Sequence, residues 1–487
     1  MKSFLLNARE RAFPASWAGK KMLRFVAIFL TVLAFASLLW PGSRHSRVAI
    51  LANTNVTIAD TVKCNPGIDL LRRLEVVKLA AYTRREIVVD FSPDPLPIRQ
   101  HVDQPLWAEE RGTTENKQPT ELEDSRDGCS IPTPMAVQVV KPPKPVDASH
   151  IDFGVATTAE RLSESLDQFV HWAGYTRTRI FALIEPDDQG AEGIRAVKAK
   201  AEDLGINLYV TVSEDDYLHR YFALVPLLEE NRRESTQWAC IIDDDTFFLS
   251  MHALVEALKG YDHTKPMYIG GLSEGLPQIA NFGMIAFGGA GVFLSQPMLT
   301  QVAAVYEDCE RMTYTGDRRI GNCIYEYTTA RLTVDHRLRQ LDLMEDASGF
   351  FEAGREPPLS VHHWKSWFKA DMPKLGVVSE LCGDTCLLRQ WRFSDGWILT
   401  NGFSVIRYGF KTDPGDISME MTWDAHNGAN MEGYLHELGP LRPKDEGKHS
   451  YLLVDAELEP NGRVTQWYIM RDSWHGDQVL ELSWRKR

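Results

Sequence analysis

The sequence predicts an α/β protein with a mostly parallel, helix-flanked sheet, an N-terminal transmembrane helix and a β-rich C-terminal extension. Three observations predict this class. Short apolar segments alternate with amphipathic ones from residue 150 onward, an uncharged apolar run lies near the N-terminus, and short β-like runs follow residue 376. Strands separated by helices of this length form parallel sheets that are covered on both faces.

The N-terminal apolar run covers residues 25–40, and Met22 and Leu23 extend it toward the roughly 20 residues that cross a bilayer. Basic residues before it predict a cytosolic tail at 1–21, a membrane anchor at 22–40 and a lumenal remainder. The alternative is a cleaved signal peptide, because residues 34–36 read Ala-Phe-Ala. Asn55 begins an N-glycosylation acceptor sequence on the lumenal side.

Residues 41–146 are predicted to form a stem, because polar and proline-rich stretches separate few periodic segments. Residues 70–89 are the exception, and their apolar periodicity predicts one helix. The formal net charge of −14 excludes the class of nucleic-acid-binding proteins, which need a basic face.

The α/β pattern occupies residues 147–375, and the β-rich region occupies 376–487. Strands are expected at 151–156, 179–184, 207–212 and 238–242, with helices over 159–172, 193–204 and 217–231. In the C-terminal region, strands are expected at 397–400, 404–408, 451–454 and 466–470. Ligands of parallel sheets bind at the carboxyl ends of strands, which directs attention to the polar residues there.

The strongest chemical signal is the strand at 238–242, which ends in three carboxylates, Asp243, Asp244 and Asp245. Burying such charge is costly unless a cation neutralises it. Side chains two residues apart in a strand point the same way, so Asp243 and Asp245 are predicted to face one ligand while Asp244 faces away or bonds locally. Oxygen ligands suit magnesium or manganese. The alternative is a solvated acidic turn.

Three other segments carry candidate residues. The glycine-rich segments at 268–271 and 287–291 fit sharp turns or close approach to a ligand, and neither matches a phosphate-binding loop. Asp317 stands at the start of a helix expected over 319–329, where it serves either as a general base or as a helix N-cap. His362 and His363 follow a short apolar run, where a neutral histidine completes a metal site or is simply structural.

Seven cysteines in a lumenal chain permit disulfides. Cys309 with Cys323 and Cys382 with Cys386 are the predicted pairs, with zinc binding as the alternative for the second. Cys240 is expected to be a buried thiol. Cys64 and Cys129 are a further candidate pair in the stem.

The order of these motifs resembles the fringe-like glycosyltransferases of glycosyltransferase family 31, and most of all their fungal branch. The resemblance covers roughly residues 150–375, with a C-terminal part around Cys382, Cys386 and Asn401. It is carried by the segments 153–158, 243–245, 287–291, 316–317 with its flanking cysteines, and 360–363. Five motifs in one order are far more specific than any single one.

The resemblance implies a GT-A fold for residues 147–375, a UDP-sugar donor, manganese or magnesium as cofactor, and inversion at the anomeric carbon. It implies a metal held by Asp243, Asp245 and His362, and Asp317 as the catalytic base. Expected nucleotide-sugar contacts are Thr157, Thr158, Arg161, Asp244, Gly288, Gly289, Ala290 and Gly291. His363 is disfavoured as a ligand because the family's histidine follows a Ser-apolar pair, as His362 does. Arg318 departs from the family pattern, which often has a second acidic residue beside the base.

The expected function is therefore sugar transfer to a glycan or glycoprotein acceptor by a single-pass type II protein of the Golgi membrane. Donor sugar, acceptor, linkage and oligomeric state are open at this level. Two other classes fit parts of the pattern. One is a metal-dependent phosphohydrolase. The other is a lumenal glycan-binding protein with a degenerate centre, in which Trp391, Trp397, Trp467 and Trp474 stack on sugars.

Overall fold

The computed structural model describes residues 56–59, 62, 64, 66–107, 132–143, 145–186, 190–314, 316–409, 418–428 and 430–487. The predicted cytosolic tail, membrane anchor and glycosylation site at Asn55 lie outside this set. Within it, no helix has the length and apolar character needed to cross a bilayer. The chain divides into two compact units, and the described part of the first holds only one helix, α3 (Ile68–Arg73). Every element below belongs to the second unit.

A mixed sheet of seven strands organises the first half of the second unit, in the order β12-β10-β11-β8-β5-β6-β7. Only β11 runs antiparallel to its neighbours, β8 and β10, so the predicted mostly parallel sheet is confirmed. The strands are β5 (Ile151–Thr157), β6 (Arg179–Ile184), β7 (Asn207–Val212), β8 (Trp238–Ile242), β10 (Tyr268–Gly270), β11 (Val292–Ser295) and β12 (Leu332–Val334).

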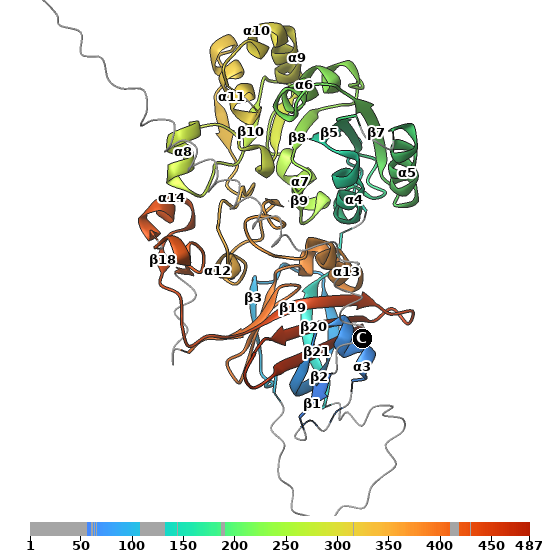
Figure 1. Cartoon of the computed structure of the whole chain (residues 1–487), viewed down its shortest axis with the longest axis vertical. Coiled ribbons are helices and arrows are strands. Elements are labelled where there is room, and N and C mark those ends of the chain that lie inside the picture. The colour runs from blue at the N-terminus through green and yellow to red at the C-terminus, as the bar shows by residue number, and fades with distance from the viewer. Residues whose placement is uncertain are drawn as a thin grey trace, which may run out of the picture. The chain divides into compact units, whose positions relative to one another are not determined.

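Helices cover both faces of this sheet (Figure 1). Alternate residues of each strand point to opposite faces, so Ile180 and Ala182 pack in one buried cluster while Phe181 and Leu183 pack in another. The helices are α4 (Ala159–Ala173), α5 (Gly190–Asp203), α6 (Tyr217–Glu230), α7 (Met251–Leu258), α8 (Leu276–Phe282), α9 (Gln296–Ala304), α10 (Tyr306–Glu310) and α11 (Gly316–Tyr327). The first cluster contains α4 side chains and the second contains α6 side chains, which is the two-sided cover that the alternating pattern predicts.

A second sheet of ten strands forms the β-rich region, in the order β1-β2-β21-β20-β19-β16-β15-β14-β3, with β4 paired to β2. The strands are β1 (Thr57–Ile58), β2 (Lys78–Ser92), β3 (Arg99–Val102), β4 (Met135–Val140), β14 (Gln390–Phe393), β15 (Ile398–Thr400), β16 (Ser404–Arg407), β19 (His449–Leu458), β20 (Val464–Met470) and β21 (Asp477–Lys486). The predicted β-rich extension is therefore present. It also takes in four strands from the residues before 147.

The predicted helix over 70–89 is wrong. Residues 78–92 form the long strand β2, which pairs in parallel with β21 and with β4. Its later residues, Ile87, Val88 and Val89, are buried and β-branched, a composition that favours strands. The partner β21 lies almost at the other end of the chain, so no local pattern could reveal this pairing.

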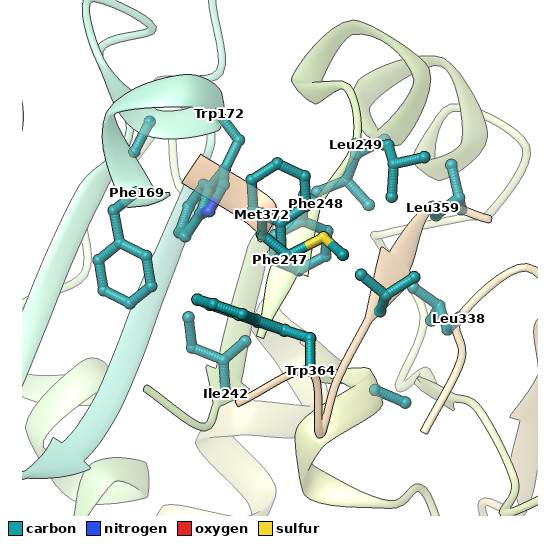
Figure 2. Close-up of a cluster of buried hydrophobic side chains, with 14 of the residues drawn as sticks. Phe169, Trp172, Ile242, Phe247, Phe248, Leu249, Leu338, Leu359, Trp364 and Met372 are labelled. Atoms are coloured by element: carbon teal, nitrogen blue, oxygen red, sulfur yellow. The ribbon is translucent and has the colours of Figure 1, made fainter. Parts of the chain in front are cut away.

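Helix α13 (Met372–Cys382) packs against both α4 and β19. Its Met372, Leu375 and Val378 belong to the buried cluster that also contains the α4 side chains. Its Leu381 belongs to the core of the second sheet. Figure 2 shows Met372 in the first of these cores, together with Trp172, Phe247 and Trp364. One helix thus gives apolar side chains to both cores.

A buried ion network lies beside the second sheet. Lys448 Nζ lies 2.9 Å from both Glu352 Oε2 and Glu420 Oε2, and both glutamates are almost fully buried. Burial alone would lower the pKa of Lys448, but the two carboxylates raise it well above its usual range. The lysine is therefore charged. Removal of its charge would leave the buried Glu352 without an ion-pair partner and Glu420 with Arg442, whose guanidinium lies 3.6 Å from Glu420 Oε2.

Both predicted disulfides are present, Cys309 with Cys323 and Cys382 with Cys386, which excludes the zinc alternative for the second pair. Cys240 is a buried free thiol, as expected. Cys64 is also disulfide-bonded. Cys129 lies outside the described residues, so its pairing with Cys64 stays a prediction.

The tryptophans proposed as sugar platforms are mostly internal. Trp391, Trp397 and Trp467 are buried in the structure, whereas Trp474 is exposed. Buried indoles cannot stack on a ligand, so the glycan-binding alternative loses three of its four platforms.

Candidate active site

Three segments meet at the carboxyl end of β8. The acidic residues follow this strand directly, and a short strand β9 (Phe247–Phe248) comes next. β9 pairs antiparallel with β13 (Ser360–Val361), with Val361 opposite Phe247. The residue after β13, His362, is thereby placed beside the residues before β9. This two-residue ladder brings the histidine to the aspartates.

The imidazole of His362 lies between the two predicted carboxylate ligands. Its Nε2 is 2.9 Å from Asp245 Oδ1 and 3.3 Å from Asp243 Oδ2. His362 and Asp245 are buried, while Asp243 is partly exposed. His362 therefore lies close to both carboxylates, as the sequence predicts. Solvent reaches this group of side chains at Asp243, which is partly exposed.

The charges of this cluster are strongly coupled. Burial would lower the pKa of His362, but Asp245 and Asp243 outweigh it and raise that pKa to about 10. Burial would raise the pKa of Asp245, but the imidazole outweighs it and lowers that pKa to about 2. Without another cation, a protonated His362 neutralises only part of the charge of the two carboxylates, and a divalent metal would take over that role by displacing the proton.

The donor set suits a divalent cation such as manganese or magnesium. Two ligands at right angles around such an ion, each about 2.1 Å from it, lie about 3 Å apart. The observed separations of 2.9 and 3.3 Å between Nε2 and the carboxylate oxygens match this spacing. Among the described residues, the group whose ligand atoms all lie within 4.8 Å of one another consists of Asp245, His362 and His363 and does not include Asp243. However, His363 Nε2 faces Asp342 Oδ1 at 3.1 Å, and its ring stacks on Trp367.

The glycine-rich turn forms the third segment, with residues 288–290 in a short 3-10 helix, η1 (Gly288–Ala290). Side-chain hydrogen bonds fasten it to both other segments: Thr246 Oγ1 donates to the Gly289 carbonyl at 3.0 Å, and Ser360 Oγ donates to the Ala290 carbonyl at 2.7 Å. Gly291 follows with φ of 98°, a conformation that favours glycine.

Two of these glycines make room for protein side chains. A Cβ on Gly289 would lie 2.1 Å from His362 Nδ1, and a Cβ on Gly288 would lie 2.3 Å from the Tyr221 hydroxyl. Real Cβ atoms do not approach other atoms so closely. The sequence suggested bare backbone for the sugars here, whereas the space beside these Cα atoms is filled by an imidazole and a phenol.

Asp244 points away from the other two aspartates, as strand alternation predicts. Its carboxylate accepts hydrogen bonds from the Thr157 hydroxyl and from two nitrogens of Arg161. The Thr158 side chain caps α4 by accepting from the Arg161 backbone N–H. The structure therefore gives Thr157, Thr158, Arg161 and Asp244 partners within the protein, and their contact with a nucleotide sugar stays a prediction.

Asp317 lies in the first turn of α11, inside the helix rather than ahead of it. Its Oδ2 accepts a hydrogen bond from the Gly288 backbone N–H at 2.8 Å, which joins it to the glycine-rich turn. Burial raises the pKa of Asp317 to about 6, and the negative charge of Asp243 adds to this effect, against the hydrogen bond from Gly288. A carboxylate with a pKa close to neutrality is suited to accept a proton.

Sequence reasoning missed three residues of this site. Tyr217 donates from its hydroxyl to Asp243 Oδ1 at 3.3 Å, and its position just beyond the carboxyl end of β7 was an available signal. Tyr221 lies one turn further along α6, with a buried hydroxyl that has no partner among the described residues. Trp364 Nε1 donates to the Asp245 carbonyl at 2.6 Å, and nothing in the local pattern around residue 364 predicts that bond.

The fold and the site define an α/β domain whose polar groups gather beyond the carboxyl end of a central strand. Residues 211–368 match the family model described as Fringe-like. This match covers Asp243, Asp245, Asp317 and His362 and confirms the expected resemblance over that segment. Residues 211–368 of the chain therefore resemble the Fringe-like family. No curated protein matches the chain.

Similar solved structures include mouse xyloside xylosyltransferase 1 in its apo form, with 10% identity, a TM-score of 0.29, and coverage of 44% of this chain and 96% of that one. The galactosyltransferase LgtC with donor and acceptor sugar analogues has 14% identity, a TM-score of 0.29, and coverage of 43% and 86%. The glycosyltransferase GlyE of Streptococcus pneumoniae TIGR4 has 13% identity, a TM-score of 0.27, and coverage of 44% and 54%.

Proposed function

We propose that this protein is an inverting, metal-dependent glycosyltransferase with a GT-A fold, which moves a sugar from a UDP-sugar to a glycan or glycoprotein acceptor. We further propose that it acts in the Golgi lumen as a single-pass type II membrane protein. The observation that carries the proposal is the convergence of His362 on Asp243 and Asp245.

Asp243, Asp245 and His362 are the residues that would hold the metal. A bound manganese or magnesium ion supplies Lewis-acid neutralisation of a diphosphate leaving group. Tyr217 supports this set, because its hydroxyl donates to Asp243 and fixes one carboxylate oxygen. Trp364 also stabilises this set, because its Nε1 donates a hydrogen bond to the backbone carbonyl of Asp245.

Asp317 acts as the general base in this proposal. Its carboxylate accepts the proton of an acceptor hydroxyl as that oxygen attacks the anomeric carbon on the face opposite the nucleotide. The hydrogen bond from Gly288 fixes one oxygen, Oδ2, and leaves Oδ1 for the acceptor. Single displacement on that face inverts the anomeric carbon, giving a β-linked product from an α-linked donor.

A UDP-release assay tests the proposal. The full-length protein in detergent is given a panel of UDP-sugars, with and without manganese and with and without a mixture of glycan acceptors. Release that needs one UDP-sugar, the metal and an acceptor is expected. Release of inorganic phosphate without any acceptor would indicate a phosphohydrolase, and binding of glycans without any turnover would indicate a degenerate centre.

The variant Asp317→Asn separates the base from the metal site. Asparagine keeps an oxygen for the Gly288 N–H but cannot take a proton, so transfer should fall by about 100-fold or more while metal-dependent UDP binding persists. The matched control is Asp308→Asn, which changes an aspartate of α10 that pairs with Arg311. Full turnover by the Asp317 variant would exclude this residue as the base.

A further inference from the structure

A group of exposed apolar side chains lies beside Arg318, the residue that follows Asp317. Helix α8 has no buried residue, and Phe282 and Met284 are 42% and 55% exposed. Phe282 packs edge-on against Phe287, which directly precedes η1, with ring centroids 6.3 Å apart. The Tyr325 hydroxyl of α11 donates to the Met284 carbonyl, so this apolar group is fastened to the helix that carries Asp317. Figure 1 shows α8 as a short helix outside the sheet.

Arg318, the neighbour of Asp317, lies among these side chains. Its guanidinium carbon is 4.7 Å from the ring centroid of Tyr314 and 6.0 Å from that of Phe282. Its Nε is buried and has no hydrogen-bond partner. Among the described residues, no carboxylate forms an ion pair with Arg318. Several other arginines of the described part do pair with acidic groups, among them Arg179, Arg337 and Arg339.

A guanidinium that lies over aromatic rings and has no acidic partner among the described residues retains N–H donors for a ligand. These donors form a fixed fork that matches the oxygens of a carboxylate, sulfate or phosphate. The aromatic side chains beside it, Tyr314 and Phe282, suit the apolar face of a sugar ring. The two features together describe a site for a sugar that carries a negative charge.

We propose that Arg318, Phe282 and Met284 form the acceptor subsite of this enzyme, and that the acceptor sugar carries an anionic group. This inference rests on the proposed function, because it takes Asp317 as the base. The base must face the attacking hydroxyl, so the ligand in contact with the adjacent Arg318 is the acceptor. The carboxylates of Asp243 and Asp317 would repel an anion, and Arg318 supplies the compensating positive charge.

Binding of matched sugars to the full-length protein tests the proposal. The probes are methyl β-D-galactoside, its uronic acid, and its 6-sulfate and 6-phosphate, together with the corresponding glucosides, measured by saturation-transfer NMR or calorimetry with UDP and manganese present. We expect an anionic member to bind at least about 10-fold more tightly than its neutral parent, as charge-assisted hydrogen bonds imply. The uronic acid, sulfate and phosphate arms identify which anion is preferred.

Variants test which residues cause the preference for anionic sugars. Arg318→Gln should abolish it, Arg318→Lys should retain part of it, and Phe282→Ala should weaken charged and neutral members equally. The control is Arg331→Gln, because Arg331 also lies over an aromatic ring, with its guanidinium carbon 5.5 Å from the ring centroid of Tyr325. That variant should keep the wild-type preference.

Three results would overturn the proposal: equal binding of charged and neutral sugars by the wild type, an unchanged preference in Arg318→Gln, or a rise in the KM for the UDP-sugar in that variant that is equal for all acceptors. The last would assign Arg318 to the donor diphosphate. Each of these can occur with UDP release intact and then counts against the subsite alone. Absence of UDP release from every UDP-sugar counts against the proposed function itself.

Discussion

Replacement of Gly289 by alanine tests the metal site with a single added carbon. The backbone of Gly289 is not in the left-handed region, so alanine meets no conformational penalty there. The new Cβ would lie 2.1 Å from His362 Nδ1, whereas ordinary contact begins at 3.4 Å, so the ring must move by about 1.3 Å. Metal–ligand distances tolerate only about 0.2 Å.

These distances set the expected loss of metal affinity and of folding stability. A shift of this size removes His362 from the donor set, and disturbed ligand orientation typically lowers metal affinity by about 10- to 100-fold. Overpacking in a buried site also costs about 1–3 kcal/mol of folding stability. We therefore expect both effects from a substitution that changes no charge and removes no hydrogen bond.

Manganese affinity is the assay, measured by electron paramagnetic resonance or by thermal shift on titration with the ion. The control is Gly376→Ala in α13, where the added Cβ would meet His171 Cβ at 3.5 Å, an ordinary contact. The control should keep wild-type manganese affinity and gain up to about 1 kcal/mol of stability. If Gly289→Ala binds manganese as tightly as the control does, His362 is not a ligand.

Three further predictions concern the base, the support of the metal site and the buried ion network. Transfer activity should fall as the pH drops through about 6, because protonated Asp317 cannot accept a proton; a flat pH–rate profile between pH 5 and 7 would speak against this assignment. Trp364→Phe leaves the buried Asp245 carbonyl without its donor, so stability in urea unfolding should decrease by about 1–3 kcal/mol and manganese affinity should weaken; unchanged values would mean that the bond is dispensable. Lys448→Met removes the cation that pairs with buried Glu352 and leaves Glu420 with Arg442 alone, so it should cost about 3–5 kcal/mol in thermal unfolding; a cost below about 1 kcal/mol would contradict a stabilising ion pair between Lys448 and Glu352.

Local periodicity was enough to predict the first sheet. The strands expected at 179–184, 207–212 and 238–242 match β6, β7 and β8 residue for residue, and the helices expected beside them differ by at most three residues. These elements are amphipathic or fully apolar over their whole length, so each one carries its own signal.

The second sheet was only partly predictable. β2 was mistaken for a helix, and β21 was missed, although the two strands pair along most of their length. Their stability comes from cross-strand contacts between residues at opposite ends of the chain, which a local pattern does not contain.

The candidate site was also only partly predictable from local sequence patterns. Three carboxylates after an apolar strand already implied a cation, and alternation along that strand already turned Asp244 away from Asp243 and Asp245. The position of His362 was implied only by resemblance, because the ladder between β9 and β13 that carries it to the carboxylates is a long-range pairing of two residues each.

The sequence by itself determined the α/β alternation, the acidic strand end and the spacing of both cysteine pairs, because these depend on neighbours in the chain or on spacing within one segment. Only the tertiary structure decided that Gly288 and Gly289 shelter protein side chains, that burial raises the pKa of Asp317, and that Arg318 lies among aromatic rings without an acidic partner among the described residues. Burial and clearance depend on atoms brought from distant segments, and those atoms acquire a common position only when the chain has folded.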